Sequence, residues 1–230
     1  MFRRVLFRSV PSCGKPDVLY QFLALVLEQL ISIIGCGRLG TAIAKLLCAK
    51  GLVADVAICN RSLESADRAV SAIGVGRAYE SLEALPQSSA YLIATPDQEI
   101  SRVAERLAEH GRLAPGSVVF HCSGSLSSDV LAPLRSCGAH VASVHPIRSF
   151  ANIASAVDGF PGTFCAVEGD DVGVARVSAL FSAIGGKIVN IEVSSKALLH
   201  AGHVFASNYL RSEEHTSELQ SRFGISYAVF

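Results

Sequence analysis

The sequence predicts an α/β fold in which a doubly wound, mostly parallel sheet carries helices on both faces. From residue 31 onward, short apolar segments alternate with amphipathic ones, and the connections between them are short. Such alternation is typical of parallel sheets built from strand–helix–strand units. Apolar residues make up 50% of the 230 residues and charged residues 17%. This composition supplies the core of one sizeable domain and excludes a disordered chain.

Each predicted element has its own local pattern. Runs of apolar, often β-branched residues predict strands at 31–34, 54–59, near Ala78, and at 90–94, 117–121, 140–144, 163–167 and 187–191. Apolar residues at helical spacing predict helices at 38–50, 63–73, 97–110, 127–135 and 171–184, and again at 194–210. Gly51 and Gly74 are the expected ends of the first two helices, because glycine readily adopts the left-handed conformation that ends a helix.

A glycine-rich turn follows the first predicted strand and opens the first predicted helix. It reads Gly35-Cys36-Gly37-Arg38-Leu39-Gly40. The first glycine permits a tight turn, the second lets the backbone approach a pyrophosphate, and the third lets the helix pack on the strand. Unpaired N–H groups at the helix start would then bind the phosphates. The alternative is a plain glycine turn, but the strand–turn–helix context favours a dinucleotide site.

The end of the second predicted strand distinguishes the two nicotinamide cofactors. An NAD site typically places an acidic residue there for the ribose 2′-hydroxyl, whereas this sequence has Asn60, Arg61 and Ser62. Arg61 can pair with a 2′-phosphate, and the two flanking side chains can donate hydrogen bonds to it. The sequence therefore favours NADP. The alternative is an exposed arginine at a strand end, with either cofactor accepted.

Polar residues also follow later strands, at the edge where open α/β sheets bind ligands. Thr95 and Pro96 follow the strand at 90–94, and Ser123 follows the strand at 117–121. We expect these residues to line the nicotinamide pocket. The Thr-Pro-Asp run is also a common helix start, and the two roles are compatible.

Candidate catalytic and substrate-binding groups lie further along the chain. Lys196 and His200 are four residues apart in a helical pattern and share one side of it, with Asn208 on the flank. Histidine can act as an acid or base near neutral pH. His145 can hydrogen-bond a substrate and Arg148 can neutralise an anionic one, although a structural role for His145 is equally compatible with the sequence.

Composition excludes several other classes of protein. Lysine plus arginine and aspartate plus glutamate both number 20, and no basic stripe marks a nucleic-acid binder. The apolar stretch 18–34 contains Gln21, Glu28 and Gln29, which argues against a membrane span. Seven cysteines without a C-x-x-C pair indicate reduced thiols, a cytoplasmic location and no metal site.

The two ends of the chain are expected to be foreign to it. Residues 1–9 and 211–230 resemble in-frame translations of a DNA-sequencing adapter. Residues 10–30 are an extension of uncertain origin. We therefore expect a dinucleotide-binding domain at 31–150 and, at 151–210, the start of a truncated C-terminal domain that consists of a β-α-β continuation and a first helix.

These motifs together resemble a known family. The segments that carry the resemblance are 33–42, 60–62, 94–97, 121–124 and 143–150. They look like Rossmann-like NADP-dependent oxidoreductases with an uncharacterised helical C-terminal domain, similar to pyrroline-5-carboxylate reductases, ketopantoate reductases and 6-phosphogluconate dehydrogenase-like enzymes.

The resemblance implies a Rossmann sheet followed by the first helix of a truncated all-helical domain, and a homodimer for the untruncated protein. It also implies hydride transfer between NADP and a small, anionic carbonyl, imine or hydroxy substrate. Lys196 would then be the proton donor or carbonyl polariser, oriented by His200 or Asn208. The alternatives are a non-catalytic NADP-binding sensor and an inactive fragment of the enzyme.

Overall fold

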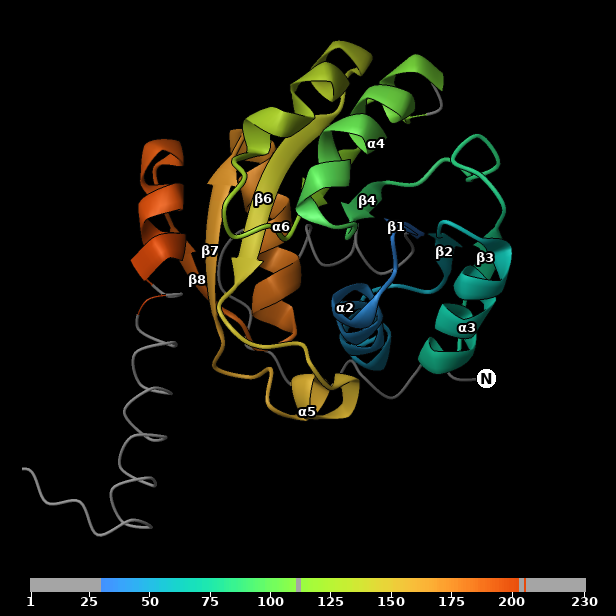
Figure 1. The fold of residues 1–230 in the computed structure, drawn as a ribbon, viewed down its shortest axis with the longest axis horizontal. Helices are drawn as coiled ribbons and strands as arrows, with labels where there is room; N and C mark the ends of the chain where they lie inside the picture. The colour runs from blue at the N-terminus through green and yellow to red at the C-terminus, as the bar shows by residue number, and fades with distance from the viewer. Residues whose placement is uncertain (1–29, 111–112, 203–204, 206–230) are drawn as a thin grey trace, which may run out of the picture.

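The computed structural model describes residues 30–110, 113–202 and 205, and it places eight strands in one sheet (Figure 1). The strand order is β3-β2-β1-β4-β5-β6-β7-β8. All neighbours are parallel except β6 and β7, which are antiparallel. The strands are β1 (Ile31–Ile34), β2 (Val56–Cys59), β3 (Arg77–Tyr79), β4 (Ala90–Ile93), β5 (Val118–His121), β6 (His140–Pro146), β7 (Phe164–Gly169) and β8 (Lys187–Asn190). The predicted doubly wound α/β sheet is confirmed.

Helices cover both faces of this sheet and divide its core into two clusters. One face packs against α2 (Arg38–Ala49), α3 (Leu63–Ile73) and α6 (Asp171–Ala183). The other packs against α4 (Asp97–His110) and the 3-10 helix η1 (Ser128–Cys137). Short helices α5 (Ile153–Asp158) and η2 (Val193–Ser195) complete the named elements, and residues 196–202 are helical beside β7 and β8 (Figure 1).

Local sequence signals explain the best-predicted helix. α3 begins after Ser62, whose hydroxyl accepts a hydrogen bond from the Ser65 N–H, and it ends at Gly74 with φ +93°. Both ends match the predicted helix at 63–73, because a side-chain cap and a left-handed glycine are local features.

Three features differ from the sequence prediction. The helix expected at 127–135 is a run of 3-10 turns that contains Pro133, which lacks the N–H an α-helix needs there. Helix α5 was not predicted. The predicted β-α-β continuation at 163–190 joins the same sheet through an antiparallel pair, β6–β7, whose direction was not predicted.

In the part of the chain that the structure describes, no helix is long and apolar enough to cross a membrane. The sequence predictions for residues 1–29 and 211–230 fall outside that part.

Candidate cofactor and substrate site

The glycine-rich turn between β1 and α2 has the geometry that a dinucleotide loop requires. Gly35 has φ +77°, and an added Cβ would lie 2.4 Å from Thr95 Cγ2 and 2.8 Å from the Thr95 backbone. Only glycine fits this position. A Cβ on Gly40 would lie 3.3 Å from Ala94 Cβ, which reflects the close packing of helix on strand, whereas a Cβ on Gly37 would meet only the Gly35 carbonyl oxygen, at 3.9 Å.

The first turn of α2 is free to receive an anion. It contains no acidic residue, and no side chain caps it. Unpaired N–H groups and the positive end of the helix dipole therefore point toward the cavity in front of it.

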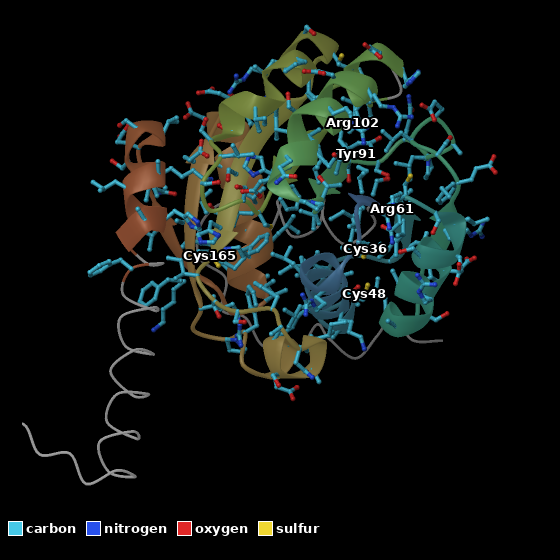
Figure 2. The ribbon with its side chains drawn as sticks, viewed as in Figure 1. Cys36, Cys48, Arg61, Tyr91, Arg102 and Cys165 are labelled. Carbon is cyan, nitrogen blue, oxygen red and sulfur yellow. The ribbon has the colours of Figure 1, made fainter. Side chains whose placement is uncertain are left out.

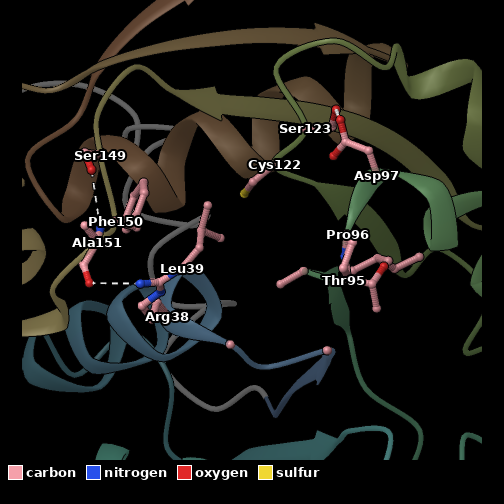
Figure 3. Close-up of a pocket in the computed structure, with 14 residues that line it drawn as sticks. Arg38, Leu39, Thr95, Pro96, Asp97, Cys122, Ser123, Ser149, Phe150 and Ala151 are labelled. Carbon is pink, nitrogen blue, oxygen red and sulfur yellow. Dashed lines mark hydrogen bonds between the residues drawn. The ribbon is translucent and has the colours of Figure 1, made fainter.

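A cavity of about 660 Å³ lies at this helix start, between the carboxyl ends of the central strands (Figure 3). This is the size range of small-molecule and cofactor sites. The cavity is lined by residues from the glycine turn, from the ends of β4 and β5, and from the loop after β6. These are Gly35, Gly37, Arg38, Leu39, Ile93, Ala94, Thr95, Pro96, Asp97, Cys122, Ser123, Ser149, Phe150 and Ala151. Seven of the predicted cofactor-binding residues are among them.

The side chains after β2 connect the glycine turn with α3. Asn60 Oδ1 accepts a hydrogen bond from the Cys36 N–H at 2.6 Å, and Asn60 Nδ2 donates to Ser65 Oγ at 3.1 Å. Arg61 is exposed at the end of β2, in the same region as Cys36 (Figure 2). Asn60 and Ser62 thus hold the local structure, whereas Arg61 makes no ion pair or hydrogen bond with the other described residues.

The inner end of the cavity is polar. Ser123 Oγ donates to Asp97 Oδ2 at 2.7 Å, and Ser125 Oγ donates to the same oxygen at 2.9 Å. Thr95 Oγ1 is buried and has no hydrogen-bond partner among the described residues. A buried hydroxyl without a partner beside a cavity is satisfied when a polar ligand binds there, which fits the predicted nicotinamide end.

Arg38 extends across the mouth of the cavity. Its Nη1 donates to the Ala151 carbonyl at 3.2 Å, although the side chain is exposed (Figure 3). This contact joins the start of α2 to the loop that follows β6. The guanidinium is therefore held close to the glycine turn, where a pyrophosphate would lie.

His145 and His200 meet above Gly124. Their ring centroids are 5.6 Å apart, at an interplanar angle of 74°. An added Cβ on Gly124 would lie 2.3 Å from His200 Nδ1 and 2.9 Å from His145 Cε1. His200 Nδ1 is buried without a hydrogen-bond partner among the described residues, and His145 Nδ1 lies 3.4 Å from the Cys122 carbonyl. The structure thus places both predicted histidines next to the Ser123 turn.

Lys196 is buried rather than exposed to the cavity. Only 2% of its side chain is exposed, and its Nζ donates to Ser143 Oγ and, at 3.1 Å, to Glu168 Oε1. Burial lowers the pKa of Lys196, and the Glu168 carboxylate opposes this effect.

Arg148 is turned away from the cavity lining. Its guanidinium donates to Thr163 Oγ1 and to the Ser155 carbonyl, both at 3.2 Å, so it braces α5 against the start of β7. The expected role of Arg148 toward an anionic substrate stays a prediction. Asn208, the third predicted catalytic residue, lies outside the described residues.

Burial keeps the neighbouring titratable groups neutral. Burial, together with the nearby Lys196 charge, lowers the pKa of His121 to about 4. Burial raises the pKa of Cys36 to about 11 and raises that of Cys122 as well. These thiols are therefore poor nucleophiles. Among the described residues, no group of histidine, cysteine and acidic side chains can hold a metal ion.

Sequence reasoning missed several residues of the site. Asp97 was considered only as a helix start, and Glu168 had no motif around it. The loop 149–151 has no pattern typical of cofactor binding. The available signals were its place after a strand at the ligand-binding edge and its overlap with the family-like segment 143–150.

Two family models match the chain. One, described as a Rossmann-like domain, matches residues 26–146. The other, described as a domain of unknown function (DUF2520), matches residues 163–226, which include the predicted adapter-like tail in part. None of the curated proteins matches the sequence.

Solved structures with the same fold cover most of the chain. A protein from Bacteroides fragilis that has been proposed to be an NADP oxidoreductase is 19% identical, with a TM-score of 0.69, over 87% of this chain and 75% of that one. Psf3 in complex with NADP+ and 2-OPP is 19% identical, with a TM-score of 0.67, over 85% and 69%. A reductive aminase from Aspergillus terreus, in complex with NADPH and ethyl-5-oxohexanoate, is 14% identical, with a TM-score of 0.64, over 87% and 68%.

At these identities the solved structures establish the fold, and the sheet order and glycine turn agree with it. Because the first family model matches more than half of the sequence, the chain belongs to the Rossmann-like domain family.

Proposed function

We propose that the chain is an NADP(H)-dependent oxidoreductase that acts on a small carbonyl, imine or hydroxy compound. The observation that carries this proposal is the cavity itself. One end of the cavity lies at the uncapped start of α2, which suits a pyrophosphate. Its other end is lined by polar groups that follow β4 and β5, which suit a nicotinamide.

NADP is favoured over NAD by the exposed Arg61 at the end of β2, where an acidic residue would select the unphosphorylated ribose. Two structures of the same fold are complexes with NADP+ and NADPH, which supports the same choice. Arg38 would add a second positive charge near the phosphates.

When bound, NADPH supplies a hydride to the carbon of a C=O or C=N group. For a carbonyl, the oxygen must then take up a proton, and Lys196 and His200 are the candidates for that donor. The donor would regain its proton from water. The cofactor carries out the redox chemistry, and the protein orients both reactants and supplies the proton.

Cofactor titration tests the proposal directly. We expect the chain to bind NADPH more tightly than NADH, measured by the fluorescence of the reduced nicotinamide. Arg61→Ala should weaken NADPH binding by about 10- to 100-fold and leave NADH binding nearly unchanged. Arg77→Ala is the matched control, because Arg77 is an exposed arginine at the opposite end of neighbouring β3. Equal binding of both cofactors by the unmodified chain would contradict the NADP assignment, and no binding of either would contradict the oxidoreductase.

One observation favours a second candidate, a non-catalytic NADP-binding sensor. Lys196 is engaged with Glu168 and does not line the cavity. A panel of small 2-oxo acids, ketones and imines, followed by NADPH absorbance, separates the two functions. Consumption of NADPH that depends on one substrate supports the enzyme, and binding without consumption favours the sensor. A cytoplasmic location and a homodimer remain part of the proposal.

A further inference from the structure

A row of polar side chains crosses three strands of the sheet behind the cavity. His121 on β5 pairs in register with Ser143 on β6, and Ser143 pairs with Glu168 on β7. Residues in register on neighbouring strands share a face of the sheet. All three are at most 3% exposed. Burying such a row is costly unless each group is partnered.

Glu168 is the most heavily engaged member of this row. Its Oε1 accepts from the Ser128 N–H at 2.9 Å and from Lys196 Nζ at 3.1 Å, and its Oε2 accepts from Ser128 Oγ at 2.7 Å. One carboxylate therefore joins β7, the start of η1 and the helix at 196–202. No sequence motif surrounds Glu168.

Lys196 occupies a position that disfavours a positive charge. It is the first residue of its helix, where the positive end of the helix dipole disfavours a cation. Burial also disfavours its charge, and Glu168 is the largest influence that favours it. The ammonium is thus retained in an unfavourable position chiefly by the Glu168 carboxylate.

The same ammonium lies close to the cavity. Lys196 interacts electrostatically with Cys122 and Asp97, and both of these residues line the cavity. Its helix carries His200 one turn later, over Gly124 at the Ser123 turn. A small displacement of the first turn would therefore move both candidate proton donors.

We propose that Glu168 is a positioning residue of the site: its carboxylate holds the Lys196 ammonium behind the inner end of the cavity and thereby places His200 over Gly124. The catalytic part of this inference rests on the proposed function. The titratable groups that face Lys196 are Glu168 on β7, His121 and Cys122 at the end of β5, and Asp97 at the start of α4.

Lysine NMR tests the placement without any substrate. The sequence has only five lysines, at 15, 45, 50, 187 and 196, so a chain labelled with ¹³C at lysine Cε gives few signals, and Lys196→Met assigns the relevant one. In Glu168→Gln the Lys196 midpoint should fall by about one to three pH units. The matched control is Glu83→Gln, which removes a carboxylate paired with Arg106 far from this row. An unchanged Lys196 midpoint in Glu168→Gln would overturn the proposal.

Cofactor and activity measurements separate positioning from a purely structural role. Glu168 does not line the cavity, so Glu168→Gln should bind NADPH within about twofold of the unmodified chain. With whichever substrate the panel identifies, the rate should fall at a lower pH than before, because the ammonium is lost earlier. Reduced thermal stability with an unchanged pH profile would overturn the proposal. If the unmodified chain fails to bind NADPH, the proposed function fails, whereas the NMR result still decides the role of Glu168.

A double variant covers the case in which Glu168→Gln does not fold. Lys196→Met with Glu168→Leu replaces the buried pair by apolar side chains, which proteins often tolerate. This variant should fold and bind NADPH but lose turnover by about 100-fold or more. Turnover at the original rate would overturn the proposal.

Discussion

Acid should destabilise this protein through one buried histidine. His121 is fully buried, and its two ring nitrogens have different partners. Nδ1 accepts from the Ser123 N–H at 3.2 Å, and Nε2 lies 3.1 Å from the Ser127 carbonyl, to which it must donate. Only the neutral ring satisfies both contacts, because a protonated Nδ1 cannot accept a hydrogen bond. Protonation would therefore disrupt the Ser123 turn that lines the cavity.

The size of the effect follows from the two pKa values. Burial lowers the pKa of His121 from 6.5 to about 4 in the folded chain. As the pH falls below 6.5, the unfolded chain binds a proton at this ring and the folded chain does not, so the free energy of unfolding decreases. The contribution of the neutral His121 ring to the free energy of unfolding is complete above pH 6.5 and is lost as the pH falls toward 4. Between pH 7 and pH 5 it amounts to about 2 kcal/mol.

Urea unfolding at pH 7 and pH 5 measures this contribution. Over this interval the free energy of unfolding of the unmodified chain should fall by about 2 kcal/mol more than that of His121→Gln. The variant will itself be less stable, so the comparison is between the two pH differences. His140→Gln is the matched control, because His140 is a partly exposed histidine on neighbouring β6. Equal pH differences in the unmodified chain and His121→Gln would refute the assignment of a neutral, buried ring.

Substitutions at three glycines give further predictions. Gly35→Ala should cost about 1 to 3 kcal/mol and abolish NADPH binding, since its Cβ would lie 2.8 Å from the Thr95 backbone; Gly74→Ala, with a positive φ but nothing within 4 Å, should be destabilised while keeping NADPH affinity. Thermal unfolding and NADPH fluorescence distinguish the two. Gly124→Ala should displace His200, leave NADPH affinity intact and lower turnover about tenfold or more, and wild-type kinetics in this variant would remove His200 from the site.

The sequence predicted best those features whose cause lies within a few residues. The bounds of α3 follow from the capping hydroxyl of Ser62 and the left-handed Gly74. The glycine turn is equally local, because its three glycines are required by the tight turn after one strand, the packing of one helix and the approach of one ligand. Hydrophobic patterning likewise located the strands, since all of them are short and six of the eight are mostly buried; β3 and β8, at the two edges of the sheet, are the exceptions.

Features that depend on contacts between distant segments were not predictable in this way. The antiparallel β6–β7 pair is set by how the chain returns through α5, and nothing in the two strands specifies its direction. Arg148 was predicted to be a cation available to a substrate, yet its guanidinium contacts Thr163 and Ser155. Lys196 was predicted as a catalytic candidate on one side of a helix, and nothing around it in the sequence indicates that it is buried against Glu168, 28 residues earlier in the chain.

This difference explains why the two ends of the cavity were predicted unequally. A phosphate is bound by backbone N–H groups and a nearby guanidinium, and both belong to one contiguous strand–turn–helix unit. A reacting carbonyl instead needs a proton donor whose charge and position are set by its surroundings. Here those surroundings come from β5, β6, β7 and η1, which meet only in the folded chain. The cofactor end can thus be inferred from a motif, whereas the catalytic end requires the register of the sheet, and the carboxylate of Glu168 becomes visible only there.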